Sequence, residues 1–166
     1  MLIAEGLMLA KDLQKKIVDL ANRINSNIYI LPNRDGIEGI DVMLAEMIAV
    51  KNELLDLQVS ILKTNTVATV AIDSKTTKTI GEAIKMVDRA RQLSAFYSSI
   101  VEKMEEKTEG FMSSSYSSNG SAVQLSPNYK LNIKEYRAEA DRLAKEARAI
   151  EKKLIQKNWT CELVKD

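Results

Sequence analysis

Two short polar stretches contain residue types that can hold a small anion. They comprise Lys63, Thr64, Asn65 and Thr66 in the first, and Thr77, Lys78 and Thr79 in the second. Threonine hydroxyls and lysine ammonium groups donate to phosphate oxygens, and a helix beginning at the second stretch would add free backbone N–H groups. Alternatively, the threonines only cap helices and Asn65 ends one. The sequence leaves an anion-binding role and a capping role both open.

Asn158 and Trp159 form a further candidate site, and Trp159 is the single tryptophan of the chain. An indole ring just past the end of a helix could stack on a nucleobase or another planar ligand. In the alternative interpretation the ring folds back as an apolar plug, and Asn158 ends the helix in the left-handed conformation. The first interpretation predicts a ligand-binding pair, and the second predicts a purely structural one.

Arg89 and Arg91 lie close to the apolar face of another predicted helix. A guanidinium group can pair bidentately with a phosphate or a carboxylate, although a solvated or salt-bridged surface arginine would have the same spacing. Tyr116 lies in a run of serines over residues 113–121. This segment is too long for an ordinary connection between helices, so it is either a disordered connector or a lid that carries Tyr116 to a ligand.

The chain contains no histidine, which excludes the Ser-His-Asp triad, the HExxH zinc site and the Glu-x-x-His di-iron site. A general base would have to be a carboxylate, a lysine or a tyrosine. Cys161 is the single cysteine and cannot form an internal disulfide, which fits a reduced, cytoplasmic setting. We therefore expect a non-enzymatic protein without metal or cofactor, and an enzyme is the weakest alternative.

The composition favours long helices. Hydrophobic residues make up 45% of the 166 positions, but aromatic residues only 5%, and there are two prolines. A net charge of +1 gives no indication of a nucleic-acid or anionic-membrane partner. The N-terminus lacks the features of a signal peptide, and no apolar run approaches the roughly 20 residues of a membrane span. These features predict a soluble protein with neither a membrane nor a sequence-specific nucleic acid as partner.

Apolar residues at alternating spacings of three and four predict four helices, over about residues 2–28, 40–62, 79–107 and 132–157. The last helix has the clearest seam, at Tyr136, Ala140, Leu143, Ala147, Ile150 and Leu154. We expect one domain over residues 1–166: an all-α antiparallel bundle of four long, coiled-coil-like helices, with a flexible Ser-rich loop over 110–130. Residues 67–72 are β-prone and could contribute a minor hairpin.

An up-down-up-down bundle would bring three helix ends to one pole: the end of the second helix, the start of the third and the end of the fourth. That pole would hold both polar stretches together with Asn158 and Trp159. The first helix has two apolar stripes, which predicts packing on two sides and hence a homo-oligomer. The second helix also has two apolar columns, one of Met47, Leu54 and Ile61 and the other of Ile48, Leu55 and Leu62.

The C-terminal stretch carries a resemblance to a known family. Residues 140–146 and the pattern Ile-Gln-x-Asn-Trp-Thr-x-Glu-Leu over residues 155–163 resemble the septicolysin-like family of small bacterial and phage helical proteins. Lys63-Thr64-Asn65 is similar to a segment where that family usually has Arg-Thr-Asn. The chain departs from the family at Asp88-Arg89, where the family has Arg-Asp, and in the serine run, where it has Tyr-Ser-Arg. The resemblance implies a helical fold and no established activity.

Two functions from different classes fit these features. The first is a non-enzymatic, oligomeric binding protein that captures a small anionic or nucleotide-like ligand at helix ends. Phage sponges that sequester immune signalling nucleotides are an analogy for it. The second is a structural or protein-interaction coiled coil without a small-molecule ligand, in which the polar stretches only cap helices.

Overall fold

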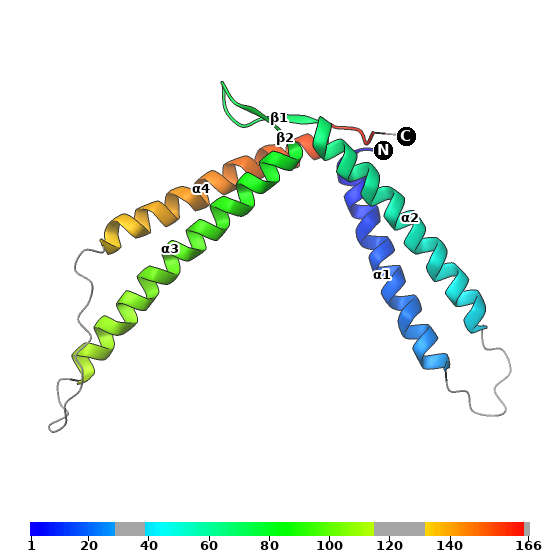
Figure 1. Ribbon diagram of the computed structural model, residues 1–166, viewed down its shortest axis with the longest axis horizontal. Coiled ribbons are helices and arrows are strands. Elements are labelled where there is room, and N and C mark those ends of the chain that lie inside the picture. The colour runs from blue at the N-terminus through cyan, green and yellow to red at the C-terminus, as the bar shows by residue number, and fades with distance from the viewer. Residues whose placement is uncertain (29–38, 115–131, 165–166) are drawn as a thin grey trace. The chain divides into compact units, whose positions relative to one another are not determined.

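The computed structural model describes residues 1–28, 39–114 and 132–164, with the backbone alone described for 106–114. The helices are α1 (Ile3–Asn27), α2 (Ile40–Val67), α3 (Ile80–Ser114) and α4 (Ile133–Asn158), and the strands are β1 (Thr69–Ala71) and β2 (Thr77–Thr79) (Figure 1). This confirms the predicted all-α fold with a minor hairpin. None of the described helices is both long and apolar enough to cross a membrane.

The hairpin forms where the sequence predicts a β-prone run. Strands β1 and β2 are antiparallel, and Val70 pairs with Lys78 in the middle of the ladder. The connecting loop is closed by Asp73, whose Oδ1 atom accepts hydrogen bonds from the backbone N–H groups of Lys75 and Thr76, both at 2.7 Å. An aspartate that binds the backbone two and three residues ahead stabilises a tight turn without glycine.

Two helices extend further than the sequence predicts. Helix α2 continues past residue 62 to Val67, so the stretch from Lys63 to Thr66 is its last turn and not a loop. Thr64 is 1% exposed, and its hydroxyl donates to the Ser60 carbonyl oxygen at 2.7 Å, which suits a helical backbone. Helix α3 continues to Ser114, so the first residues of the predicted Ser-rich loop are helical. Gly110 costs a helix only about 1 kcal/mol relative to alanine, which is too little to end it.

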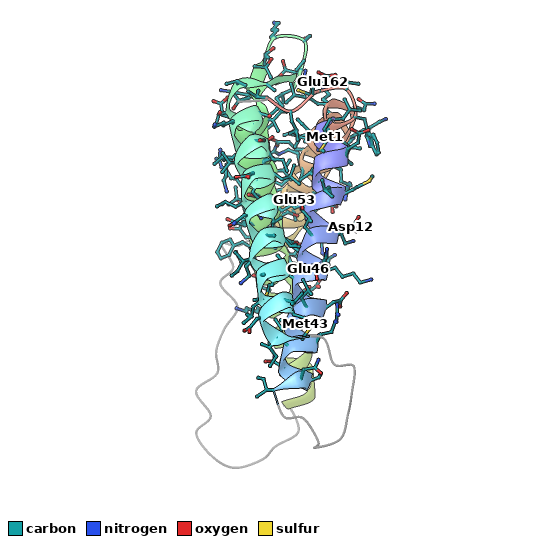
Figure 2. The ribbon with its side chains drawn as sticks, turned by 90° about the vertical axis from the view of Figure 1, so that its right-hand side faces the viewer. Met1, Asp12, Met43, Glu46, Glu53 and Glu162 are labelled. Atoms are coloured by element: carbon teal, nitrogen blue, oxygen red, sulfur yellow. The ribbon has the colours of Figure 1, made fainter. Side chains whose placement is uncertain are left out.

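The chain divides into two compact units, and the first comprises Met1–Glu82 with Lys153–Asp166. Within it α1 and α2 lie side by side and antiparallel (Figure 2). Their buried core consists of Ala10, Leu13, Leu20, Val50, Leu57 and Ile61. Burying each of the larger side chains contributes about 1.5–3 kcal/mol, so this packing is the main support of the pair. Lys16 and Glu46 form an ion pair of 2.7 Å across it.

The two chain termini are joined by backbone hydrogen bonds in the first unit. Ile3 N–H donates to the Cys161 carbonyl oxygen and Leu163 N–H to the Met1 carbonyl oxygen, both at 2.9 Å. Met1 and Glu162 accordingly lie at the same end of the α1–α2 pair (Figure 2). The segment after α4 therefore fixes where the end of α4 lies relative to the start of α1.

The second unit comprises Ala83–Lys152 and pairs the remaining lengths of α3 and α4. The Ser94 hydroxyl donates to the Ala140 carbonyl oxygen at 2.8 Å, and the rings of Tyr97 and Tyr136 lie 5.6 Å apart. The buried residues include Ala83, Val87, Ala90, Val101, Ala140, Leu143, Ala147 and Ile150. The predicted seam of the last helix is thus buried at these four α4 positions.

Candidate functional site

In the polar stretch at the end of α2, the hydroxyl groups of Thr64 and Thr66 form hydrogen bonds within the chain. The Thr64 hydroxyl accepts a hydrogen bond from Val164 N–H at 2.9 Å and donates its own proton to Ser60. The Thr66 hydroxyl donates to the Lys63 carbonyl oxygen at 2.7 Å. Thr64 therefore links α2 to the C-terminal segment, and its single donor is already used.

The stretch before α3 forms a capping box. Thr79 N–H donates to Glu82 Oε2 at 2.8 Å, and Glu82 N–H donates to Thr79 Oγ1 at 3.1 Å. Lys78 lies 3.7 Å from the same carboxylate, and Thr77 is exposed in β2. The hydrogen bond from Thr79 N–H lowers the pKa of Glu82, helped by the Thr79 hydroxyl and by Lys78. The Glu82 carboxylate occupies the place that the ligand hypothesis assigns to an external anion.

The predicted convergence of helix ends at one pole is present in the first unit. The end of α2 touches the start of α3, because a Cβ atom on Gly81 would lie 3.2 Å from the Asn65 carbonyl oxygen. Lys153 near the end of α4 donates to the Ile72 carbonyl oxygen next to β1. The pole thus exists, but the groups that build it mainly satisfy one another.

An open hollow of about 280 Å³ lies at this pole between the start of α1 and the end of α4. It is lined by Ala4, Leu7, Met8, Lys11, Ile155, Asn158 and Trp159. Trp159 is 50% exposed, so its ring is a surface shelf and not a buried plug. Leu7, Met8 and Ile155 are exposed beside it. The turn after α4, in which Cys161 N–H donates to the Lys157 carbonyl oxygen at 2.9 Å, holds this segment in place.

Two polar groups of this hollow, which we call the Trp159 hollow, have unused binding capacity. The Asn158 Oδ1 atom is shielded from solvent and accepts no hydrogen bond from the described residues. A buried acceptor without a donor costs about 1–3 kcal/mol. Lys11 is exposed and forms no ion pair within the described part of the chain. The hollow therefore offers an aromatic face, an apolar floor, an amide and a cation.

A second hollow of about 480 Å³ lies between α3 and α4 in the second unit. It is lined by Met86, Arg89, Ala90, Leu93, Tyr97, Glu139, Arg142, Leu143 and Glu146. Arg142 is held between Glu139 at 2.7 Å and Glu146 at 3.0 Å, and its hydrogen bonds lower the pKa of Glu139. Arg89 forms no ion pair with the described residues, but two arginines and two glutamates cancel in charge. This hollow is a weaker site for an anion than its arginines suggest.

The remaining predicted site residues fall elsewhere. Arg91 forms an ion pair of 2.5 Å with Glu151, so it is the salt-bridged surface arginine of the two alternatives that the sequence left open. Tyr116 lies outside the described residues. Among the residues that are described, no group of three or more potential metal ligands is close enough to hold a metal ion.

Sequence reasoning missed several residues that line the two hollows. Leu7, Met8, Lys11 and Ile155 have no local signal, because their role depends on where the end of α4 lies against α1. Glu139, Arg142 and Glu146 could have been found, since spacings of three and four place oppositely charged residues together on one helix face.

Three comparisons place the chain among known proteins. A family described as "Family of unknown function (DUF6847)" matches residues 10–163. No curated protein matches the chain. Among solved structures, the chain is similar to a functionally unknown conserved protein from Corynebacterium diphtheriae, with 21% sequence identity, a TM-score of 0.79 and 99% of each chain covered. At that identity the likeness shows a shared fold.

Proposed function

Because the chain belongs to DUF6847, a family of unknown function, only its own residues can indicate an activity, and we propose that it binds a small anionic, nucleotide-like ligand beside Trp159. In this proposal the protein is not an enzyme. It captures and sequesters the ligand, as phage sponges do with immune signalling nucleotides. The resemblance to the septicolysin-like family adds no activity to this proposal.

The observation that carries the proposal is the exposure of Trp159. Trp159 is 50% exposed although it is the single tryptophan of the chain, and it lies among other exposed apolar side chains. Stacking of a nucleobase on an aromatic side chain contributes about 1–3 kcal/mol and does not depend on base identity. The exposed Leu7, Met8 and Ile155 give the ring of such a ligand further apolar contact.

The polar groups of the Trp159 hollow suit the rest of such a ligand. Lys11 can neutralise part of an anionic group, and because it is exposed, this contribution weakens as salt increases. Asn158 lines the hollow with an amide whose Oδ1 atom lacks a donor. An amino or hydroxyl group of a ligand that reached Asn158 would supply that donor.

The test uses the protein's own fluorescence. Because Trp159 is the single tryptophan, a ring stacked on it should change the emission of the whole protein directly. The panel consists of mononucleotides and cyclic dinucleotides, with ribose 5-phosphate as the control without a base. We expect quenching by nucleotides and none by ribose 5-phosphate. Absence of any emission change and of any shift in melting temperature over the panel at millimolar concentration would reject the proposal.

Matched variants locate the site by calorimetry. Trp159→Ala should raise Kd roughly 5- to 150-fold, the equivalent of one stacking contact. The control Phe96→Ala removes an aromatic side chain that is 61% exposed on α3 and should leave Kd unchanged. Lys11→Ala should raise Kd about two- to fivefold, as an exposed ion pair does, and Lys15→Ala on the same helix should not.

The second candidate function is a coiled-coil interaction protein without a small ligand. An apolar stripe that α2 leaves exposed favours it: Ile48, Leu55 and Leu62 are 55%, 57% and 63% exposed. If this were the whole function, Trp159→Ala and Lys11→Ala would change the melting temperature alone, and the nucleotide panel would give no response.

A further inference from the structure

Helix α2 has an apolar stripe that its packing against α1 does not use. Its buried face includes Met43, Val50 and Leu57. The exposed stripe consists of Ala45, Ile48, Asn52, Leu55, Val59 and Leu62. The steps along it alternate between three and four residues, which is the spacing of a coiled-coil seam. The first stripe of α2 therefore packs within the chain, and the second has the pattern of a helix that pairs with another helix.

The residue types along the stripe specify the kind of coiled coil. In heptad notation Ala45, Asn52 and Val59 occupy a positions, and Ile48, Leu55 and Leu62 occupy d positions. Val59 at a with Leu55 and Leu62 at d is the combination that favours two strands, and a single asparagine at a fixes the register. From this pattern we infer that α2 pairs, parallel and in register, with α2 of a second copy of the chain.

The asparagine sets the direction of the two helices. In a parallel, in-register pair each a residue faces its own counterpart, so the two Asn52 amides hydrogen-bond with each other. In an antiparallel pair an a residue faces a d residue, and every d residue of the stripe is Ile48, Leu55 or Leu62. The Asn52 amide would then lie buried against an aliphatic side chain without a partner, which is unfavourable. The parallel arrangement satisfies the amide.

The residues beside the seam are complementary in the same arrangement. In a parallel pair, the g residue of one helix lies beside the e residue five positions further along its partner. This rule brings Lys51 beside Asp56 of the second copy, and symmetry gives the same pair twice. Neither residue has an ion-pair partner within the described part of the chain. The flanking g–e pairs are Leu44 with Ala49 and Gln58 with Lys63, so no like charges meet.

The dimer surface differs from the one expected from the sequence alone. The two apolar stripes of the first helix predict oligomer contacts on α1. In the structure Leu13 and Leu20 of α1 are buried in the core with α2. Besides the side chains around the Trp159 hollow, the first unit leaves the long apolar stripe of α2 exposed.

The oligomeric state tests the inference. Sedimentation equilibrium of the full chain should give twice the monomer mass of 18.6 kDa. Leu55→Glu should give a monomer with unchanged helical circular dichroism, because Leu55 is exposed within one chain. The control Val18→Glu makes the same type of change at a residue of α1 that is 57% exposed, and it should remain dimeric. A wild-type monomer at every concentration, or a dimer that Leu55→Glu leaves intact, would overturn the inference.

Two further measurements test direction and register. In a Cys161→Ser background, Leu62→Cys should form a disulfide between copies on mild oxidation, since only a parallel pair brings the two residues 62 together near one end of the seam. Cross-linking of Ala45→Cys with Leu62→Cys chains, without self-linking of either, would overturn the parallel arrangement. Lys51→Glu should weaken the dimer by placing like charges together, and adding Asp56→Lys should restore it. Failure of this restoration would overturn the proposed register.

Discussion

Asn158 and Asn65 have side-chain oxygens that are buried without a hydrogen-bond donor among the described residues. Such an atom lowers the stability of the folded chain, so its retention calls for a physical reason. For Asn158 the reason that we propose is its place beside Trp159 in a hollow open to ligands. Asn65 lies against Gly81 at the crowded contact between α2 and α3 and lines neither of the two hollows described above.

Replacing Asn158 tests two effects of its side-chain amide: a lower stability of the free protein and a higher affinity for the ligand. Asn158→Leu removes the unsatisfied oxygen and should stabilise the free protein by about 1 kcal/mol. The same variant should bind nucleotides more weakly, because the amide is lost. Thermal unfolding with and without the ligand measures both effects. The control Asn22→Leu changes an exposed residue of α1 and should alter neither. A variant that is less stable than the wild type would contradict the assignment.

Glu82 should contribute to the pH dependence of the protein's stability. The hydrogen bond from Thr79 N–H holds the pKa of Glu82 below its ordinary value near 4.5. Since the folded pKa is the lower one, the stabilisation is present above pH 4.5 and is lost as the pH falls through the folded pKa. Melting temperatures measured between pH 7 and pH 3 should therefore fall less in Glu82→Gln than in the wild type. Glu53→Gln, at an exposed residue of α2, is the control, and an equal fall in all three proteins would contradict the prediction.

At the scale of elements, the helices could be predicted from the sequence because apolar spacing is a local property. The N-terminal caps of α3 and α4 are local as well: Glu135 N–H donates to Asn132 Oδ1 at 3.3 Å, as the spacing of the two residues indicates. The end of α2 could not be predicted in this way. Lys63 to Thr66 have turn-forming composition, but a contact with Val164 from the other end of the chain keeps Thr64 in the helix. Long-range contacts thus override local preference here.

Thr64→Val tests this contact. Valine has nearly the shape of threonine but cannot accept the hydrogen bond from Val164 N–H, so a partly buried donor loses its partner. The expected destabilisation is about 1–3 kcal/mol, seen as a lower midpoint of urea unfolding with an unchanged slope. Thr66→Val removes an exposed hydroxyl from the same turn and should change stability by about 0.5 kcal/mol or less. Similar effects of the two variants would show that the contact with the C-terminal segment contributes nothing.

Only part of the Trp159 hollow could be predicted from the sequence. The sequence indicates Asn158 and Trp159, since a lone tryptophan after a helix is recognisable by itself. Leu7, Met8 and Lys11 were not, because the backbone hydrogen bonds between Ile3 and Cys161 and between Met1 and Leu163 decide that they lie there. The resemblance to the septicolysin-like family stays a prediction and says nothing about these positions.

At the scale of the whole molecule, the two proposals use different faces. The Trp159 hollow involves Leu7, Met8 and Lys11 of α1, whereas the dimer seam consists of residues of α2. None of the seam residues lines the hollow. A dimer through α2 therefore contains two complete hollows, and neither depends on the partner copy for a side chain.

This separation predicts independent binding. Calorimetry should give one nucleotide per chain, hence two per dimer, with a single Kd, because sites that share no residue and no moving element have no coupling free energy. The monomeric variant Leu55→Glu should bind with the wild-type Kd, and Trp159→Ala should remain dimeric while losing affinity. One nucleotide per dimer, or loss of binding in Leu55→Glu with helical circular dichroism unchanged, would mean that the ligand lies at the contact between copies. The function would then belong to the dimer and not to the Trp159 hollow.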